Sequence, residues 1–315
     1  MTKRQGQHIA LVSAREALAL DEDLPPLREA VTALGAHVDT PCWDDATVDW
    51  ARYDLAVLRS TWGYADRLDE FLDWARRCAA LTRLVNPPEV VRWNTDKRYL
   101  MQLARAGVPV VPTRFVTPGA DAATELCGFL DGGPDRLSVG MTSDFQEFVV
   151  KPTVGAGSRD VARYHCADSE RAVKHLERLL IAGRSAMLQP YLDRVDEHGE
   201  TAAIYFGGEF SHAVRKGPLL QTGGDFVAGL FAPEAISARA ADHAERRVAD
   251  ATCAAIPFDS LLYVRVDLIR DDTGAPVVLE VELTEPSLFF AHAPGSAQRL
   301  ATALLERCTT SRGAS

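Results

Sequence analysis

The sequence predicts an α/β protein with an N-terminal lobe built on a parallel sheet and two further lobes. Short apolar strands alternate with amphipathic helices over residues 9–86, which is typical of a parallel sheet covered by helices. A chain of 315 residues is longer than one minimal domain and favours two or three lobes. Apolar residues make up 47% of the chain and charged residues 25%, as in an ordinary globular enzyme.

The first lobe is predicted from its alternating periodicities. Gly35 ends the first helix, because glycine readily takes the left-handed conformation that follows a helix. No G-x-G-x-x-G motif occurs, so a Rossmann dinucleotide site lacks its main support. The expected strands are residues 9–12, 54–60 and 83–86, and the expected helices are residues 24–36 and 67–81.

The pattern changes beyond the first lobe. We expect a helix within residues 94–113, capped by Asn94 or Thr95 and ended by Gly107. A strand, a glycine loop and a helix then form a small second lobe. The third lobe has hairpin-like strands, a long helix at about 234–255, two more strands and a final helix. The predicted domains are residues 1–112, 113–187 and 188–315.

Composition argues against several classes of protein. The net charge of −10 disfavours a general nucleic-acid surface or an anionic-membrane surface. The six cysteines form no C-x-x-C pair, so neither a zinc site nor a redox pair is indicated. Arg15 and Glu16 interrupt the early apolar stretch, and no run of about 18 apolar residues exists. We therefore expect a cytoplasmic protein with reduced thiols.

An apolar run near the C-terminus, VLEVELTEPSLFF, carries three carboxylates: Glu280, Glu282 and Glu285. A buried carboxylate without a partner is costly, so it either finds one or takes up a proton. The preceding stretch YVRVDLIR also alternates like a strand, and the turn-forming residues Asp272–Ala275 separate the two. An antiparallel hairpin is therefore predicted.

This hairpin predicts a register. Asp267 lies opposite Glu280 and Arg265 opposite Glu282, so three carboxylates converge on one face. Like charges in such positions destabilise a sheet, and oxygen donors without neighbouring Cys or His favour Mg²⁺ or Mn²⁺. A solvated strand face assisted by Arg265 is the alternative at this point.

Two lysines stand in positions that suit an anion. Lys97 falls in the first turn of its expected helix, where the macrodipole disfavours a cation unless an anion is bound. Lys151 ends an apolar strand and precedes a glycine loop whose backbone N–H groups could face phosphate. Taken singly, a surface lysine and a hairpin tip explain these features as well. The stretch MLQPYL could hold a flat base against Tyr191 and Leu192, or form a core strand edge.

Taken in order, these motifs resemble the ATP-grasp superfamily over about residues 85–295. EVELTEP is similar to the metal strand of glutathione-synthetase-like and D-alanine-ligase-like members, although Glu282 stands where Asn is common. The resemblance implies an ATP-grasp fold: an N-terminal parallel α/β lobe, plus two lobes that clasp ATP between them.

The resemblance also implies roles for individual residues. Lys97 and Lys151 would contact the nucleotide phosphates, and Asp267, Glu280 and Glu282 would hold one or two Mg²⁺ or Mn²⁺ ions. Glu200, or its rival Glu197, would hold the ribose. Further ATP contacts would come from the loop residues Gly155, Ala156, Gly157 and Ser158 and from Gln189, Tyr191 and Leu192 at the adenine.

A smaller ATP-grasp subgroup marked by S-T-W-x-Y is the most similar, through Ser60–Tyr64, HAVRK (212–216) and EPSLFF. It includes the O-ureido-serine cyclo-ligase of cycloserine biosynthesis. The chain departs from it at 223–231, which lacks a basic residue near Asp225. By this resemblance Ser60, Thr61, Trp62 and Tyr64 would shape the acceptor pocket; a buried Trp beside a turn at Gly63 is the alternative. Arg215, expected on a strand that faces the site, would act with Lys151 in catalysis by stabilising the transferred phosphoryl group, or else be a surface strand arginine.

The expected function is therefore an ATP- and Mg-dependent carboxylate–amine ligase that acts through an acyl phosphate on an amino-acid derivative. The most specific expectation is closure of O-ureido-D-serine to D-cycloserine, a step in antibiotic biosynthesis. An intermolecular amino-acid or dipeptide ligase, or a glutathione-synthetase-like ligase, is the alternative. A non-catalytic ATP-sensing module is an alternative of another class. The expected partner is a small amino-acid-like substrate, with no nucleic acid or membrane, and a homo-oligomer is compatible with the sequence.

Overall fold

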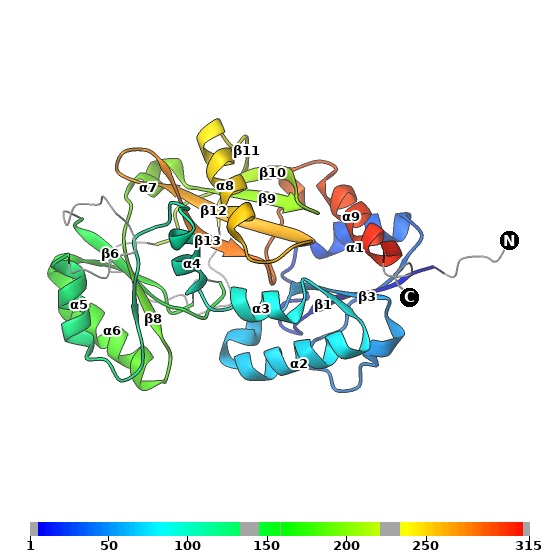
Figure 1. The fold of residues 1–315 in the computed structure, drawn as a ribbon, viewed down its shortest axis with the longest axis horizontal. Helices are drawn as coiled ribbons and strands as arrows, with labels where there is room; N and C mark the ends of the chain where they lie inside the picture. Colours follow the sequence, from blue (N-terminus) through cyan, green and yellow to red (C-terminus); the bar gives the residue numbers. More distant parts are fainter. Residues whose placement is uncertain (1–5, 133–144, 158, 221–233, 311–315) are drawn as a thin grey trace.

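The structure is a computed structural model that describes residues 6–132, 145–157, 159–220 and 234–310. It contains three sheets (Figure 1). A parallel sheet has the strand order β2-β1-β3-β4, and two antiparallel sheets have the orders β5-β8-β6-β7 and β11-β10-β9-β12-β13. The predicted α/β class with a parallel N-terminal lobe is confirmed.

The parallel sheet forms the N-terminal lobe, with buried strands that read as continuous apolar runs because both faces are covered. Its first helix carries prolines in its opening turn and is followed by Gly35 at φ 91°. The strands are β1 (His8–Ser13), β2 (His37–Asp39), β3 (Leu55–Ser60) and β4 (Arg83–Val85), and the helices are α1 (Leu24–Ala33), α2 (Leu68–Leu81) and α3 (Pro88–Asn94), with 3-10 turns at Trp50–Arg52 and Trp62–Asp66.

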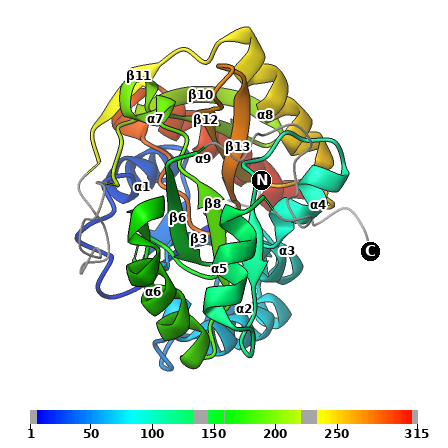
Figure 2. The same cartoon turned by 90° about the vertical axis from the view of Figure 1, so that its left-hand side faces the viewer.

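The four-stranded antiparallel sheet forms a small lobe. Figure 2 shows α5 and α6 on the side of this sheet that faces away from the rest of the molecule. The elements are α4 (Tyr99–Arg105), which leads into the lobe, then β5 (Arg114–Val116), α5 (Ala122–Leu130), β6 (Glu147–Pro152), β7 (Ala162–His165), a 3-10 turn (Cys166–Asp168), α6 (Ser169–Ile181) and β8 (Ala186–Pro190).

The five-stranded sheet forms the central lobe. One face packs against α8, and the other shares a core with β1, β3, α1 and α9. The C-terminal helix thus returns to α1, beside which it lies in Figure 1. The elements are α7 (Arg194–His198), β9 (Glu200–Phe206), β10 (Glu209–Lys216), β11 (Ile236–Arg239), α8 (His243–Ala255), β12 (Tyr263–Arg270), β13 (Pro276–Glu282), a 3-10 turn (Phe290–His292) and α9 (Ser296–Thr310).

The helix expected to start at Asn94 or Thr95 begins only at Tyr99. Asn94 is instead the last residue of α3, and its side chain donates to the Val281 carbonyl at 2.7 Å and accepts from the Leu283 N–H at 2.7 Å. The predicted cap is wrong because this amide satisfies the backbone of β13. Lys97 therefore lies in the connection between α3 and α4 and not in a first helical turn.

The long helix expected at about 234–255 is also shorter than predicted. It starts at His243 behind a capping box, in which Asp242 accepts from the Glu245 N–H and Glu245 accepts from the Asp242 N–H. Residues 236–239 form the edge strand β11 instead, because they pair with β10.

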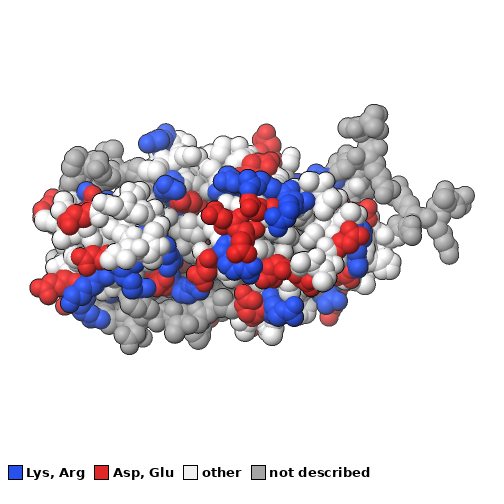
Figure 3. All heavy atoms as spheres, turned by 90° about the horizontal axis from the view of Figure 1, so that it is seen from below, with Lys and Arg blue, Asp and Glu red and all other residues white. Residues whose placement is uncertain are grey.

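Charge is mixed on the face seen in Figure 3, where Lys and Arg alternate with Asp and Glu among the residues described there. Among the residues that the structure describes, no helix is long and apolar enough to cross a membrane.

Candidate functional site

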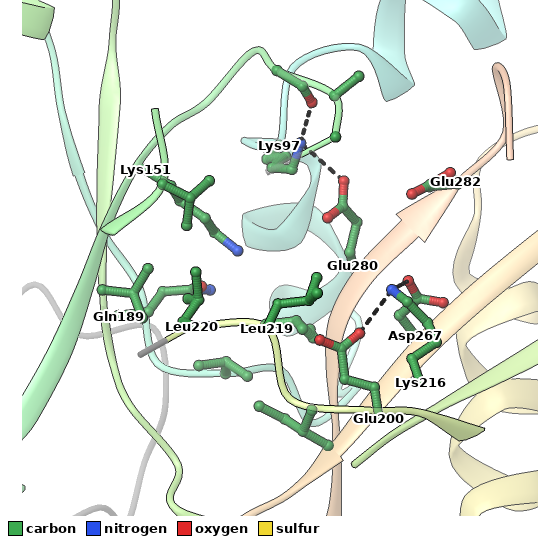
Figure 4. A pocket seen from close by; sticks show the side chains of 18 of the residues that line it. Lys97, Lys151, Gln189, Glu200, Lys216, Leu219, Leu220, Asp267, Glu280 and Glu282 are labelled. Atoms are coloured by element: carbon green, nitrogen blue, oxygen red, sulfur yellow. Dashed lines mark hydrogen bonds and ion pairs between the residues drawn. The ribbon is translucent and has the colours of Figure 1, made fainter. Parts of the chain in front are cut away.

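A pocket lies where the three lobes meet, and Figure 4 shows it from close by. Its wall is formed by side chains of the small lobe, the central sheet and the turn after β3. Most of the residues predicted for the site line it together: Trp62, Tyr64, Lys97, Lys151, Gly155, Ala156, Gly157, Gln189, Tyr191, Leu192, Glu200, Asp267, Glu280 and Glu282. Their individual roles stay predictions.

The β12–β13 hairpin has the predicted register at the pocket. Asp267 pairs with Glu280 and Arg265 with Glu282. A bulge between Asp267 and Leu268 shifts the pairing by one residue toward the turn, so Arg270 faces Pro276. The carboxylates therefore share one face, as alternation along two paired strands requires.

Each of these carboxylates has a cationic partner. Glu280 lies 2.9 Å from the Lys97 ammonium, and Arg265 forms ion pairs with both Asp267 and Glu282. Burial alone would raise the pKa of Glu280, but the charges of Lys97 and Lys151 outweigh it and lower the pKa. Burial raises the pKa of Glu282 to about 7. These cations together offset the repulsion between the carboxylates that the sequence predicted, which Arg265 alone could not do.

A divalent cation fits the donor chemistry of this face, which presents carboxylate oxygens and no sulfur or imidazole. The fit is uneven. The Glu280 and Glu282 side chains are 24% and 26% exposed, whereas that of Asp267 is 3% exposed and both of its oxygens bond to Arg265. Within the described residues, no three acidic, His or Cys side chains are grouped as a metal centre. The ligand set therefore stays a prediction.

Lys151 differs from the other lysines of the pocket. Lys97 and Lys216 form ion pairs, whereas the Lys151 ammonium has none with the residues that the structure describes. Burial lowers the pKa of Lys151 to about 8. A buried cation without a partner, facing a pocket, is suited to receive an anion.

The glycine loop after β6 folds over the lysines. Lys97 donates to the Gly155 carbonyl at 2.9 Å, and the Lys97 N–H donates to the Thr153 carbonyl. Gly157 has φ 68°, a conformation that L side chains rarely adopt. Ser158, predicted as part of this loop, lies outside the described residues.

One end of the pocket is apolar, where Leu192 and Tyr191 of the hinge after β8 meet Ile269 and Leu279. The Arg163 guanidinium lies 3.4 Å from the centroid of the Tyr191 ring, so one face of this ring is already covered. Gln189 is buried and donates to the Thr113 hydroxyl at 2.9 Å. This end offers a slot for a flat apolar ring between aliphatic walls.

The structure separates the two acids proposed for a ribose. Glu200 lines the pocket at the start of β9 and accepts from Lys216 at 2.9 Å. Glu197 belongs to α7, and its side chain is exposed and does not line the pocket. Glu200 is therefore the candidate that geometry favours.

Arg215 was expected to face the site, and that placement is wrong. Its guanidinium donates to the carbonyls of His198 and Glu197, away from the pocket. Adjacent residues of a strand point to opposite faces, so Lys216 is the residue of β10 that faces the acids.

Lys216 is the cation that sequence reasoning missed. It donates to Glu200 at 2.9 Å and to Asp267 at 3.1 Å (Figure 4). Burial would lower its pKa, but these two carboxylates raise it well above the ordinary value. HAVRK offered two adjacent basic residues, and only the pairing of Lys216 with Glu200 decides which of them shares the acidic face.

The residues predicted to contact the substrate fall into two groups, according to whether they line the pocket. Trp62 and Tyr64 line the pocket, whereas Ser60 and Thr61 do not. The Ser60 hydroxyl lies 2.6 Å from that of Ser13 within the N-terminal core, where the end of β3 is covered on both faces. The placement of Ser60 and Thr61 at the pocket surface was therefore wrong.

Glu285 completes the pocket beside Trp62, whose indole N–H donates to the Glu285 carbonyl at 3.1 Å. This carboxylate lies in an apolar run of the sequence, from which no role was predicted for it. The segment 223–231, which carried a departure from the subgroup, lies outside the described residues.

Comparison with known proteins identifies the relatives of this chain. Residues 9–86 match the family model described as the D-cycloserine synthetase DcsG N-terminal domain. The cycloserine biosynthesis protein DcsG of Streptomyces lavendulae is 43% identical over 304 residues, which cover 95% of this chain and 98% of that protein. A crystal structure of D-cycloserine synthetase DcsG aligns with a TM-score of 0.88 and 42% identity over 96% of this chain and all of that one.

More distant structures show the same fold. D-alanine–D-alanine ligase from Bacillus anthracis, complexed with ATP, aligns with a TM-score of 0.65 and 16% identity, over 98% of each chain. The ATP-grasp ligase PsnB, complexed with minimal precursor, Mg and ADP, aligns with a TM-score of 0.62 and 17% identity, over 98% of this chain and 99% of that one. At these identities the likeness concerns the fold, and it confirms the predicted ATP-grasp architecture.

Proposed function

The chain belongs to the family of ATP-grasp ligases that includes the cycloserine biosynthesis protein DcsG, and from that premise we propose that it closes O-ureido-D-serine to D-cycloserine with ATP. The observation that carries the proposal is the 43% identity over 95% of the chain. A pocket with an acidic face, an apolar slot and a buried lysine that forms no ion pair with any described residue supports it. The substrate is an amino acid whose carboxylate and attacking nitrogen belong to one molecule.

ATP binds with its base in the apolar slot formed by Tyr191 and Leu192, next to Gln189. Its phosphates lie against Lys151 and Lys97, under the loop that begins at Gly155. Glu200 accepts the ribose hydroxyls. A divalent cation, Mg²⁺ or Mn²⁺, held by Glu280 and Glu282 with Asp267 beside them, would neutralise charge on the phosphate oxygens.

The residues of the chain act mainly by position and charge. Lys151 holds the γ-phosphoryl group in line with the substrate carboxylate, which attacks it to give an acyl phosphate and ADP. The glycine loop excludes water, which would hydrolyse that intermediate. Lys216 and Arg265 replace Arg215 as the cations near the oxygens of the transferred group.

Ring closure follows within the same molecule. The nitrogen bonded to oxygen attacks the acyl carbon, loses its proton and expels inorganic phosphate. The carbamoyl group left on that nitrogen then departs with one water as carbamic acid, which balances the atoms of D-cycloserine. No protein nucleophile is needed for either step, which agrees with a pocket built from cations, carboxylates and aromatic side chains.

An ADP-release screen over amino-acid derivatives tests the proposal. O-ureido-D-serine alone is expected to give stoichiometric ADP, phosphate and a cyclic product identified by mass spectrometry. An intermolecular amino-acid, dipeptide or glutathione-synthetase-like ligase would instead require two substrates. ATP binding without ADP release for any carboxylic acid would point to a sensing module and contradict the proposal.

A pair of neighbouring substitutions tests the corrected role on β10. Lys216→Met is expected to lower ADP release by about tenfold or more, because a charge-assisted contact near the phosphoryl group is lost. Arg215→Met, on the opposite face, is expected to have a smaller effect. Initial rates at saturating ATP measure both, with thermal unfolding as the check on folding. A larger loss for Arg215→Met would restore the original assignment.

A further inference from the structure

Glu285 differs from every other carboxylate that lines the pocket. Glu200, Glu234, Asp267, Glu280 and Glu282 each lie within 4.0 Å of a lysine or arginine. Glu285 has no such partner among the residues that the structure describes, and its Oε2 accepts no hydrogen bond there. It is only 8% exposed. A buried carboxyl oxygen without a partner is costly, so it calls for a group that the free protein does not hold.

The position of Glu285 is fixed from the N-terminal lobe. The Trp62 indole holds its carbonyl, and the fully buried Arg59 donates to the Pro286 carbonyl at 3.0 Å. Asp23 accepts the N–H groups of Leu288, Phe289 and Phe290. Hydrogen bonds therefore hold the backbone on both sides of Glu285, so conformational freedom of this segment does not explain the oxygen without a partner.

The surroundings of Glu285 define the chemistry of its missing partner. The charge of Glu282, and less that of Glu280, acts on Glu285 and is only partly offset by Lys97, so an anion placed directly against its free oxygen would be repelled. The Tyr64 hydroxyl interacts with its carboxyl group, and Trp62 adds an aromatic wall. An N–H donor with an apolar stem satisfies these neighbours: it gives a hydrogen bond to the free oxygen and packs against the rings.

We infer that Glu285 binds an N–H-bearing group of the amino-acid substrate, with Tyr64 on the other side of the carboxyl group. This rests on the proposed function, and it names the residue that recognises the nitrogen side of that substrate. Two groups of O-ureido-D-serine have this chemistry: the α-ammonium group and the urea nitrogens. An experiment can distinguish them.

The test compares Glu285→Gln with wild type and with Glu89→Gln, which makes the same change at an exposed site of α3. Glu285→Gln is expected to raise KM for O-ureido-D-serine by about tenfold, since an amide replaces the carboxyl group that accepts the N–H. KM for ATP is expected to stay within about twofold, because the nucleotide contacts other residues. Equal KM values for the substrate in wild type and variant would overturn the inference.

The desamino analogue 3-(ureidooxy)propanoate separates the two sources of N–H. If Glu285 binds the α-ammonium group, this analogue binds wild type and Glu285→Gln equally. If Glu285 binds the urea nitrogens, the variant loses affinity for both compounds. Each result supports the inference and assigns the group. Calorimetric titration in the presence of a non-hydrolysable ATP analogue gives the affinities without turnover.

A second arm does not depend on the proposed substrate. D-serine and D-glycerate differ only in the amino group, so their thermal shifts are compared in the wild type and in Glu285→Gln. D-serine is expected to stabilise the wild type more than D-glycerate does, and this difference is expected to vanish in the variant. No difference in the wild type, or the same difference in both proteins, would exclude the α-ammonium group as the partner of Glu285. If Glu285→Gln also bound O-ureido-D-serine and its desamino analogue as tightly as the wild type does, the role of Glu285 would be overturned. Absence of ADP release with O-ureido-D-serine would count against the proposed function alone.

Stability separates a binding role from a merely structural one. Burial, and then the charge of Glu282, raise the pKa of Glu285 to about 8, while Tyr64 and Lys97 lower it and Glu280 raises it. The folded pKa exceeds the unfolded one, so the contribution to stability is full below about 4.5 and is lost as pH rises through about 8. Glu285→Gln is therefore expected to raise the unfolding temperature at pH 8 but not at pH 4.5. A structural role predicts a lower unfolding temperature at both pH values.

Discussion

Replacing Lys151 with alanine is expected to abolish ADP release while the protein stays folded. The Lys151 ammonium is buried, faces the pocket and forms no ion pair with any described residue, so an anion is the partner that its position suits. Loss of a preorganised charge at a transferring phosphoryl group lowers rates by on the order of a hundredfold or more. Single-turnover ADP formation with saturating substrate measures this loss.

Loss of the Lys151 charge in Lys151→Ala is not expected to destabilise the folded protein. Burial lowers the pKa of Lys151 to about 8, so at neutral pH its charged form is held at a cost in the folded state. Lys151→Met keeps most of the aliphatic stem and separates packing from charge. Lys174→Ala, at an exposed position of α6 in the same lobe, is the matched control. Normal ADP release by Lys151→Ala would contradict the phosphate assignment.

Replacing Glu280 with alanine is expected to raise the Mg²⁺ concentration for half-maximal ADP release by about tenfold or more, because a charged ligand oxygen is lost. The partly exposed Glu280 carboxylate reaches the pocket from β13, opposite Asp267. Titration of Mn²⁺ binding by electron paramagnetic resonance gives a readout that does not require turnover.

Glu280 also pairs with Lys97, so its removal has a second effect. Without that carboxylate, burial is expected to lower the pKa of Lys97, which Glu280 now raises. Glu280→Gln retains a hydrogen-bond acceptor for Lys97 and separates this effect from metal binding. Glu177→Ala, exposed on α6, is the control for removal of a carboxylate. An unchanged metal titration in both Glu280 variants would exclude Glu280 from the metal ligands.

The sequence predicted those parts of the fold that depend on neighbours along the chain. Alternating apolar residues and a turn-forming linker were enough to place Asp267 opposite Glu280, because a tight turn fixes the register of its strands. The two helix starts that were predicted wrongly, at residues 94–95 and at about 234, have a common cause. Asn94 hydrogen-bonds to β13, and residues 236–239 pair with β10, which are contacts between distant segments.

Only part of the candidate site could be predicted, because the rest depends on contacts between distant segments. The order of the motifs predicted that the lysines, the glycine loop and the acidic hairpin meet in one pocket. It did not reveal that Arg215 points to the α8 face while Lys216 points to the acids, which depends on the pairing of β9 with β10. It also did not reveal that Ser60 is covered by the N-terminal core.

By itself the sequence determined the fold class, the order of the binding elements and the hairpin register, since periodicity and turn chemistry act over short separations. Only the tertiary structure decided which cation neutralises which carboxylate. Lys97, Lys216 and Arg265 reach the acids from three separate segments, whereas Glu285 has no cationic partner among the residues that the structure describes. Such pairings depend on how the sheets pack, because the charges meet only once distant strands share a core.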